Sequence, residues 1–151
     1  MKGKNHIKIA LSLTVFTLNL PLIASAVVGS ILPDIDSSTS IICSVIPFSG
    51  RTFGRLRHRG ITHSLVALSL TTIASYLIFK SFSVSLGFFV GYLSHILSDM
   101  MTVKGVELMW PNRKLYRIGL NIRTGSKLEY VTVSIIILMA SVATFKLWNW
   151  F

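Results

Sequence analysis

The sequence predicts an all-α fold: a polytopic membrane bundle with a fold-back N-terminal helix pair, a transmembrane hairpin and a C-terminal transmembrane helix. Composition is the first reason, because the 151-residue chain is 52% hydrophobic and only 13% charged, with a mean hydropathy of +0.67. Four apolar stretches are the second, since each approaches the length at which a helix crosses a hydrocarbon core. These stretches are residues 7–32, 61–79, 82–101 and 130–151. The chain length suits a single domain over residues 1–151.

The first apolar stretch has three interpretations. It fits one long span, two short helices that fold back at residues 19–21, or a signal peptide in which residues 24–26 (Ala-Ser-Ala) resemble a cleavage site. Charge favours the fold-back, because that topology puts thirteen of the fifteen Lys and Arg residues on one face. They are Lys2, Lys4, Lys8, Arg51, Arg55, Arg57, Arg59, Lys104, Arg113, Lys114, Arg117, Arg123 and Lys127. Cytoplasmic faces carry such an excess, so this face is expected to be the cytoplasmic face of a multi-pass membrane protein.

The remaining stretches have clear boundaries. Only Lys80 and Ser81 separate the second stretch from the third, so as helices these two must form a tight antiparallel hairpin. Ser126 and Glu129 match a capping box, a pair that satisfies free backbone N–H groups at the start of a helix. The last helix is therefore expected to open there.

The net charge of +10 raises the question of a nucleic-acid partner. The basic residues lie in loops and at segment ends, however, and form no stripe interleaved with aromatic residues. This pattern favours membrane lipids with anionic headgroups as the partner and argues against nucleic acid. The lone Cys43 excludes an internal disulfide. None of these patterns indicates an oligomeric state.

Acids and histidines gather in three short clusters, although the chain has only five acidic residues and four histidines. The clusters are Asp34 with Asp36, His58 with His63, and His95 with Asp99. Carboxylates and imidazoles are metal ligands, and burying them unpaired beside a membrane is costly. The fold-back topology brings all three clusters to one end of the bundle, together with His6 and Glu129. Helical proteins build metal sites in this way, so a metal site is predicted.

Each cluster also has a structural interpretation. His95 and Asp99 are four residues apart and share a helix face, either as two ligands or as a polar pair that holds helices together. Asp34 and Asp36 repel each other unless a cation or several donors lie between them, but one of them could simply cap a turn.

The stretch from His58 to Ser64 offers more chemistry. His63 is a ligand candidate, His58 could bind a metal or shuttle a proton, and Arg59 could hold an anionic substrate group. Thr62 is a candidate cap for the following helix. The alternative is a basic collar at the membrane interface. His6, taken alone, is most simply interfacial, and for Glu129 the capping role is at least as good as metal binding.

Taken in order, these residues resemble the YdjM-type family of LexA-regulated, inner-membrane, metal-dependent hydrolases. The resemblance rests on residues 32–36 (Leu-Pro-Asp-Ile-Asp), 58–64 (His-Arg-Gly-Ile-Thr-His-Ser) and 91–102, and it covers the chain from about His6 to Glu129. It implies a helical membrane protein with a divalent-metal hydrolase site, distantly similar to the zinc-dependent phospholipase C and nuclease group. The family also tends to carry a histidine near its N-terminus, which adds weight to His6 as a ligand.

The resulting hypothesis is a hydrolase that acts at the cytoplasmic membrane face on a phosphoester or a lipid-linked phosphate. One or two divalent ions, preferably zinc, are expected on a set of six residues. This set is His6, Asp34, Asp36, His63, His95 and Asp99. Asp36 or Glu129 is the expected general base, His58 a further catalytic group, and Arg57 or Arg59 the residue that neutralises substrate charge. The alternatives are divalent-metal transport or sensing without hydrolysis, and a small membrane scaffold without metal.

Overall fold

The computed structural model describes residues 1–37, 40–45 and 58–148, and the named elements in this part of the chain are all helical, with no named strand. The predicted all-α class is therefore confirmed for this part of the chain. The helices are α1 (Gly3–Thr14), α2 (Leu20–Ile31), α3 (Ile41–Val45), α5 (Leu65–Phe79), α6 (Phe82–Met100) and α7 (Lys127–Trp148). Short 3-10 turns are η1 (Val15–Thr17), η2 (Leu32–Asp36) and η3 (Ile61–His63). Of the basic residues assigned to the cytoplasmic face, Arg51, Arg55 and Arg57 lie outside the described residues.

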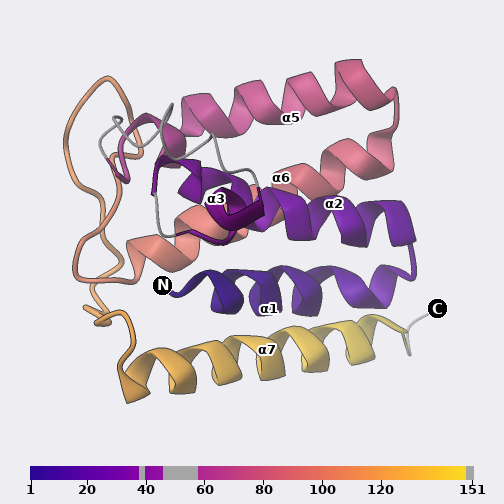
Figure 1. Cartoon of the computed structure of the whole chain (residues 1–151). Coiled ribbons are helices and arrows are strands. Elements are labelled where there is room, and N and C mark those ends of the chain that lie inside the picture. The colour runs from indigo at the N-terminus through magenta and orange to yellow at the C-terminus, as the bar shows by residue number, and fades with distance from the viewer. Residues whose placement is uncertain (38–39, 46–57, 149–151) are drawn as a thin grey trace.

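The N-terminal fold-back is confirmed: α1 and α2 form an antiparallel pair joined by a tight turn (Figure 1). Leu18 takes a left-handed conformation with φ of 50°, which reverses the chain. The Asn19 side chain then accepts a hydrogen bond of 3.1 Å from the backbone N–H of Leu22 and caps α2. Pro21 stands in the first turn, where a missing N–H costs nothing.

The α5–α6 hairpin is also confirmed, and it turns at the two predicted residues. Lys80 ends α5 in a left-handed conformation, and the Ser81 hydroxyl caps α6 by accepting from the backbone N–H of Val84. Both hairpin turns lie at the right-hand end of Figure 1, and the chain N-terminus lies at the opposite end. The ends of α2 and α6 that carry the acid and histidine clusters therefore share the end where the chain begins.

Within the described part of the chain, no helix is both long enough and apolar enough to cross a bilayer. Helix α5 has 15 residues, or about 22 Å at 1.5 Å per residue, against a hydrocarbon core of about 30 Å. It starts late because η3 occupies the beginning of the second apolar stretch and Ser64 caps the helix, its hydroxyl accepting from the backbone N–H of Ala67. The predicted polytopic arrangement, with a transmembrane hairpin and a C-terminal transmembrane helix, is not supported.

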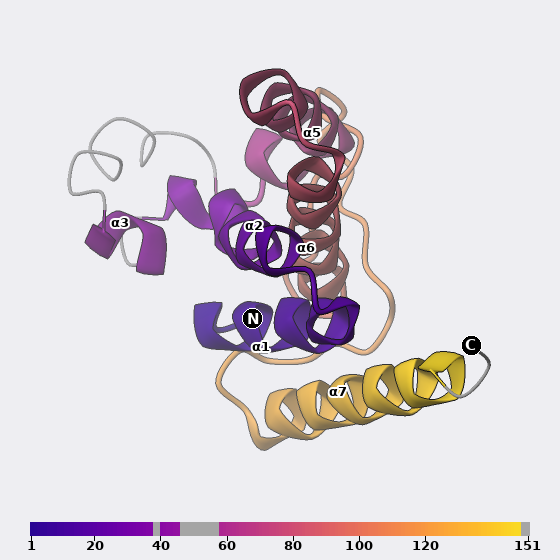
Figure 2. The same ribbon diagram turned by 90° about the vertical axis from the view of Figure 1, so that its right-hand side faces the viewer.

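Helices α2 and α6 pack most closely, because glycines line their crossing. A Cβ at Gly91 would lie 2.0 Å from the carbonyl oxygen of Ala26, and one at Gly87 would lie 2.0 Å from the Ser25 hydroxyl. Any larger residue would push the helices apart. Helix α5 packs on α6, and α7 packs on α1 (Figures 1 and 2). The close crossing fixes the position of α6 relative to the end of α2.

The segment between α6 and α7 covers one end of the bundle without forming a regular element. Two isolated bridges organise it, Thr102 with Ile122 and Val106 with Tyr116. Val106 and Ile122 are fully buried, so each bridge is anchored by an apolar side chain. The segment also accepts a backbone hydrogen bond from Leu65, which ties it to the start of α5.

Candidate metal centre

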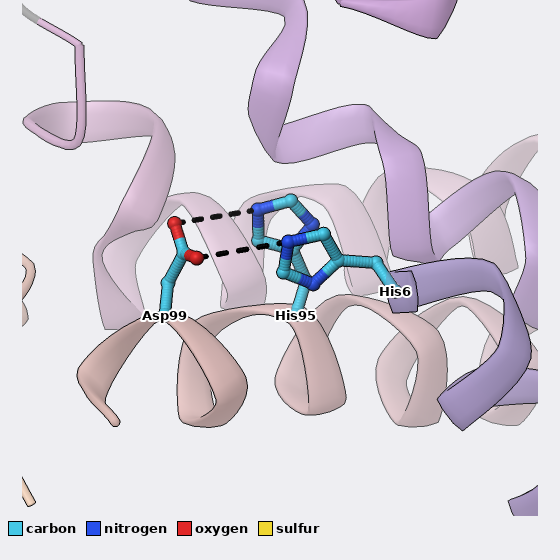
Figure 3. Close-up of side chains that lie close together, drawn as sticks. All are labelled: His6, His95 and Asp99. Atoms are coloured by element: carbon cyan, nitrogen blue, oxygen red, sulfur yellow. Dashed lines mark ion pairs between the residues drawn. The ribbon is translucent and has the colours of Figure 1, made fainter. Parts of the chain in front are cut away.

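Three groups of His and Asp side chains bring ligand atoms within 4.8 Å of one another. The groups are His6, His95 and Asp99; Asp34, His63 and His95; and Asp34, Asp36 and His58. They come from α1, η2, η3, α6 and the residues just before η3. Five of the six predicted metal ligands, all except Asp36, fall in the first two groups. Figure 3 shows the first group, with the His6 and His95 rings stacked beside Asp99.

The orientation of the His95 ring is fixed by the end of α2. Its Nδ1 lies 2.6 Å from the carbonyl oxygen of Ser30. Because a carbonyl only accepts, Nδ1 must carry the hydrogen, and the neutral ring then presents an Nε2 lone pair. Burial, followed by the nearby His63, lowers the pKa of His95 to about 4, so this ring is neutral at pH 7.

His63 is oriented through a chain of two hydrogen bonds. The Thr62 hydroxyl donates to Asp36 Oδ2 at 2.6 Å, and the Thr62 hydroxyl oxygen lies 3.0 Å from His63 Nδ1. With its own hydrogen committed, Thr62 can only accept from His63 Nδ1–H. His63 therefore also presents its Nε2 lone pair, and this atom lies 3.2 Å from His95 Nε2.

His6 follows the same rule through Ser98. The Ser98 hydroxyl donates to the His95 carbonyl at 2.9 Å and lies 2.8 Å from His6 Nδ1, from which it accepts. His6 Nε2 is buried and has no hydrogen-bond partner among the described residues. Its ring stacks on His95 with centroids 3.7 Å apart (Figure 3). Burial and the neighbouring His95 hold the pKa of His6 well below its usual value, which keeps the ring neutral.

Two carboxylates border these nitrogen atoms. Asp99 has Oδ1 3.6 Å from His6 Nε2 and Oδ2 3.6 Å from His63 Nε2. Asp34 Oδ1 lies 3.6 Å from His95 Nε2 and 3.8 Å from His63 Nε2. Burial raises the pKa of Asp34. At Asp99 burial acts in the same direction, but the adjacent histidines and the Met1 amine outweigh it and hold the pKa well below its usual range.

The donor set fits a divalent cation. Three imidazoles aim their Nε2 atoms into one space beside two carboxylates, and without a cation or a proton these groups repel one another. Ligand atoms 3.2–3.9 Å apart have the separation of donors that share one ion about 2.0–2.2 Å from each. Nitrogen and carboxylate donors together are typical of zinc.

Asp36 has a different task from Asp34. Its Oδ1 accepts from His58 Nδ1 at 2.8 Å, and its Oδ2 accepts from the Arg59 backbone N–H at 3.2 Å and from the Thr62 hydroxyl. Burial acts to raise its pKa, but the hydrogen bonds from His58 and Thr62 outweigh burial and lower it. Asp36 was predicted as a ligand or a general base; it belongs to the third ligand group, and both of its oxygens also accept hydrogen bonds. The structure favours a positioning role for Asp36.

His58 and Arg59 were both predicted as catalytic groups, and they differ in exposure. The His58 side chain is 40% exposed, and with Nδ1–H held by Asp36 its Nε2 is available to other groups. Arg59 is buried in a left-handed conformation with φ of 67°. Its Nη2 lies 3.0 Å from Asp99 Oδ2 and its Nη1 donates to the Thr102 hydroxyl at 2.6 Å. Arg59 thus pairs with Asp99, which limits its freedom to bind a substrate.

Glu129 was predicted as a catalytic carboxylate, but its contacts are those of a helix cap. It is fully buried and belongs to none of the three ligand groups of the described residues. Oε1 accepts from the Lys2 backbone N–H at 2.7 Å and from Asn5 Nδ2 at 2.6 Å, and Oε2 accepts from the Gly125 N–H at 2.5 Å. The predicted capping box is present, because the Ser126 hydroxyl accepts from the Glu129 N–H at 3.3 Å. Glu129 therefore ties the start of α1 to the start of α7.

Sequence reasoning missed the residues that orient the imidazoles. Ser98 and the Ser30 carbonyl were not singled out, and Thr62 was expected to cap the helix that Ser64 caps instead. A serine in an apolar helix is most simply a packing residue, which hid Ser98. The sequence feature that could have indicated a role for Ser98 is its position, three residues after His95 and next to Asp99.

Comparison with known proteins now places the chain in a family. A family profile described as YdjM inner membrane protein matches residues 1–151. The chain belongs to the YdjM family. The inner membrane protein YdjM of Escherichia coli (strain K12) is 32% identical over 148 residues, which cover 85% of this chain and 76% of that protein. The YdjM protein of Shigella flexneri matches with the same identity and coverage.

A third relative comes from another bacterium. The uncharacterized protein YvsG of Bacillus subtilis (strain 168) is 30% identical over 112 residues, covering 74% of this chain and 70% of that protein. No solved structure matches the chain. The family predicted from the sequence motifs is thus confirmed. The names of the two YdjM proteins describe a location, not an activity.

Proposed function

We propose that this YdjM-family chain is an inner-membrane, metal-dependent hydrolase that acts on a phosphoester. The observation that carries the proposal is the common aim of the His6, His63 and His95 Nε2 atoms, each with its Nδ1–H held by an oxygen. Metal-binding histidines show this arrangement, because the outer hydrogen bond fixes both tautomer and ring direction. Asp34 and Asp99 complete the donor set.

A divalent ion, zinc by the nature of its donors, would supply Lewis acidity that polarises a phosphoryl oxygen and lowers the pKa of water to about 7. The chain's own residues then have separate tasks. His58, held by Asp36 at 2.8 Å, accepts at Nε2 the proton that water loses as its oxygen bonds to phosphorus. The ester P–O bond breaks as this bond forms, and the leaving oxygen takes up a proton. Arg59 holds Asp99 in place through their ion pair of 3.0 Å.

The membrane end of the molecule is the end that carries both hairpin turns. Leu18 and Leu20 at one turn are 76% and 74% exposed, and Ile78 and Phe82 at the other are 72% and 73% exposed. Leaving so much apolar surface in water is unfavourable, and the relatives are named inner membrane proteins. The proposal is that this end inserts into the bilayer and the metal end faces the cytoplasm, where a phospholipid or lipid-linked phosphate is a suitable substrate.

Elemental analysis of protein purified in mild detergent tests the metal centre. Wild type is expected to hold about one or two divalent ions per chain, and His95→Ala and Asp99→Ala are expected to lose them. Ser94→Ala is the matched control, because this residue belongs to none of the three ligand groups and its hydroxyl donates to a carbonyl of its own helix. Stoichiometric metal in His95→Ala would overturn the proposed ligand set.

Activity separates the hydrolase from its main alternative. The metal-loaded wild type is expected to hydrolyse at least one member of a panel of phosphomonoesters, phosphodiesters and phospholipids, and His95→Ala none. A protein that retains metal but hydrolyses none of them would favour transport or sensing instead.

A further inference from the structure

A pocket of about 660 Å³ opens beside the metal centre and joins it to a basic wall. Asp34, His58 and Arg59 line the pocket on the side of the centre, and Lys104 and Arg123 line it elsewhere. Its size is in the range of pockets that enclose a whole small molecule, roughly 300–1,000 Å³. The pocket thus has room for more of a substrate than the phosphoryl group that reacts.

The backbone that carries the two basic residues is fixed. Thr102 and Ile122 form an isolated bridge, with the Val103 N–H donating to the Ile122 carbonyl at 3.2 Å and the Ile122 N–H donating to the Met101 carbonyl at 3.0 Å. Lys104 and Arg123 follow the two bridge residues by two positions and one position, respectively. The bridge therefore holds both basic residues in neighbouring segments on the same wall.

The basic wall is also connected to the metal centre. The Thr102 hydroxyl accepts from Arg59 Nη1 at 2.6 Å and donates to the Asp99 carbonyl at 2.7 Å. The same arginine pairs with the Asp99 carboxylate at 3.0 Å. The distance from the ligands to the wall is therefore set by direct hydrogen bonds and does not depend on a loose loop.

Lys104 and Arg123 carry positive charge that the described part of the chain does not neutralise. Both are exposed, and no described carboxylate forms an ion pair with either. Lys2 also lines the pocket, but its Nζ donates to the Tyr130 hydroxyl at 3.1 Å, so its ammonium group is turned towards α7. Two cationic groups beside a pocket attract an anion.

We propose that Lys104 and Arg123 bind a second anionic group of the substrate, next to the phosphoryl group that is attacked at the metal centre. The inference rests on the proposed hydrolase function and narrows its substrate to a compound with two neighbouring anionic groups, as in a diphosphate. A simple phosphomonoester would fill the metal end of the pocket and leave the basic wall without a partner.

Binding of inorganic diphosphate and of inorganic phosphate, measured by calorimetry, tests the subsite on the full chain in detergent. The metal-loaded wild type is expected to bind diphosphate more tightly than phosphate. In the double variant Lys104→Ala/Arg123→Ala, diphosphate affinity should fall about tenfold or more, as expected for two lost charge-assisted contacts. Its affinity for phosphate and its metal content should stay within about twofold of wild type.

The matched control is Arg113→Ala/Lys114→Ala, which removes two charges from the same segment at residues that do not line the pocket. An equal loss of diphosphate affinity in the control would show a general charge effect and overturn the subsite. An unchanged diphosphate affinity in the first variant would overturn it too.

The same titrations on chelated protein separate the two proposals. If wild type holds no metal but still binds diphosphate, and the double variant Lys104→Ala/Arg123→Ala does not bind it, the metal-dependent function fails and the anion site stands. If metal is held and the double variant binds diphosphate like wild type, the function stands and the subsite fails.

Discussion

The Nε2 atoms of His63 and His95 lie 3.2 Å apart, and the opposite nitrogen of each ring is already committed as a donor to an oxygen. Two lone pairs therefore face each other inside the protein, with the Asp99 carboxylate 3.6 Å and 3.9 Å away. Such an arrangement is unfavourable until a positive charge enters it. Asp99 is already paired with the Met1 amine and with Arg59, but the hydrogen bonds around the two rings exclude the neutral tautomers that would relieve the contact between the Nε2 atoms. A shared proton or a bound metal ion would relieve it.

Ser98→Ala should weaken metal binding although serine is no ligand. The change removes the oxygen that accepts from His6 Nδ1–H, so the ring loses its fixed tautomer and direction. Loss of such an outer hydrogen bond lowers metal affinity by about 10- to 100-fold. Competition with a chelator of known affinity measures the change. Ser94→Ala is the control, because that hydroxyl donates only to a carbonyl of its own helix; equal losses in both variants would exclude a specific role for Ser98.

Asp34→Asn and Asp36→Asn should differ, although the two residues are one position apart. Asp34 borders the imidazole nitrogens, and its loss should remove most of the bound metal. Asp36 accepts from His58, Arg59 and Thr62, so Asp36→Asn should keep most of the metal and lose hydrolytic rate. Metal content and single-turnover rate, measured on the same samples, check this. The assignment is reversed if Asp36→Asn releases the metal and Asp34→Asn does not.

Glu129→Gln should destabilise the fold and leave the chemistry intact. The carboxylate accepts three N–H bonds, including one from the start of α1 and one from the turn before α7. The amide group of Gln replaces one acceptor by a donor, which leaves a buried N–H unsatisfied at a cost of about 1–3 kcal/mol. Thermal unfolding in detergent measures the loss. If the folded variant instead keeps its melting temperature and loses activity, Glu129 is catalytic after all.

Gly91→Ala should destabilise the contact between α2 and α6. The added Cβ would meet the Ala26 carbonyl at 2.0 Å, and because backbone lies on both sides, the helices must separate, at about 1–3 kcal/mol or more. The Ser30–His95 hydrogen bond would be strained with them, so metal affinity should fall as well. Gly119→Ala is the control: it has φ of 69° and nothing within 4 Å, so it should cost only about 1 kcal/mol and keep the metal.

The metal-free protein should lose stability as the pH falls from 7 to 5. Burial lowers the pKa of His95 to about 4 and that of His6 well below the usual 6.5. In this range the unfolded chain takes up protons at both histidines while the folded chain does not, so acid favours unfolding. His95 alone accounts for about 2 kcal/mol between pH 6.5 and pH 5. Unfolding of the chelated protein at several pH values measures the slope, which should be shallower in His95→Gln; equal slopes would refute the assignment.

The hairpins were predictable because their signals are local. Asn19 and Pro21 mark the start of α2, and Lys80 and Ser81 leave no room for a longer connection between α5 and α6. Helix starts were less predictable. The apolar run that starts at residue 61 gives no sign that η3 precedes α5, since hydrophobicity does not distinguish a 3-10 turn from an α-helix. For that reason the helix expected over residues 61–79 was longer than α5.

The sequence by itself determined the helical class, the family and the residues with ligand chemistry, because these follow from composition, local caps and the order of short motifs. The tertiary structure decided which of those residues act together. It gave Asp34 and Asp36 different partners, left Glu129 outside the three ligand groups of the described residues, and added Ser30, Thr62 and Ser98. The physical reason is that the ability to bind a metal belongs to the side chain itself. The tautomer and the direction of each histidine ring, in contrast, are set by hydrogen bonds to residues that can lie far away in the chain.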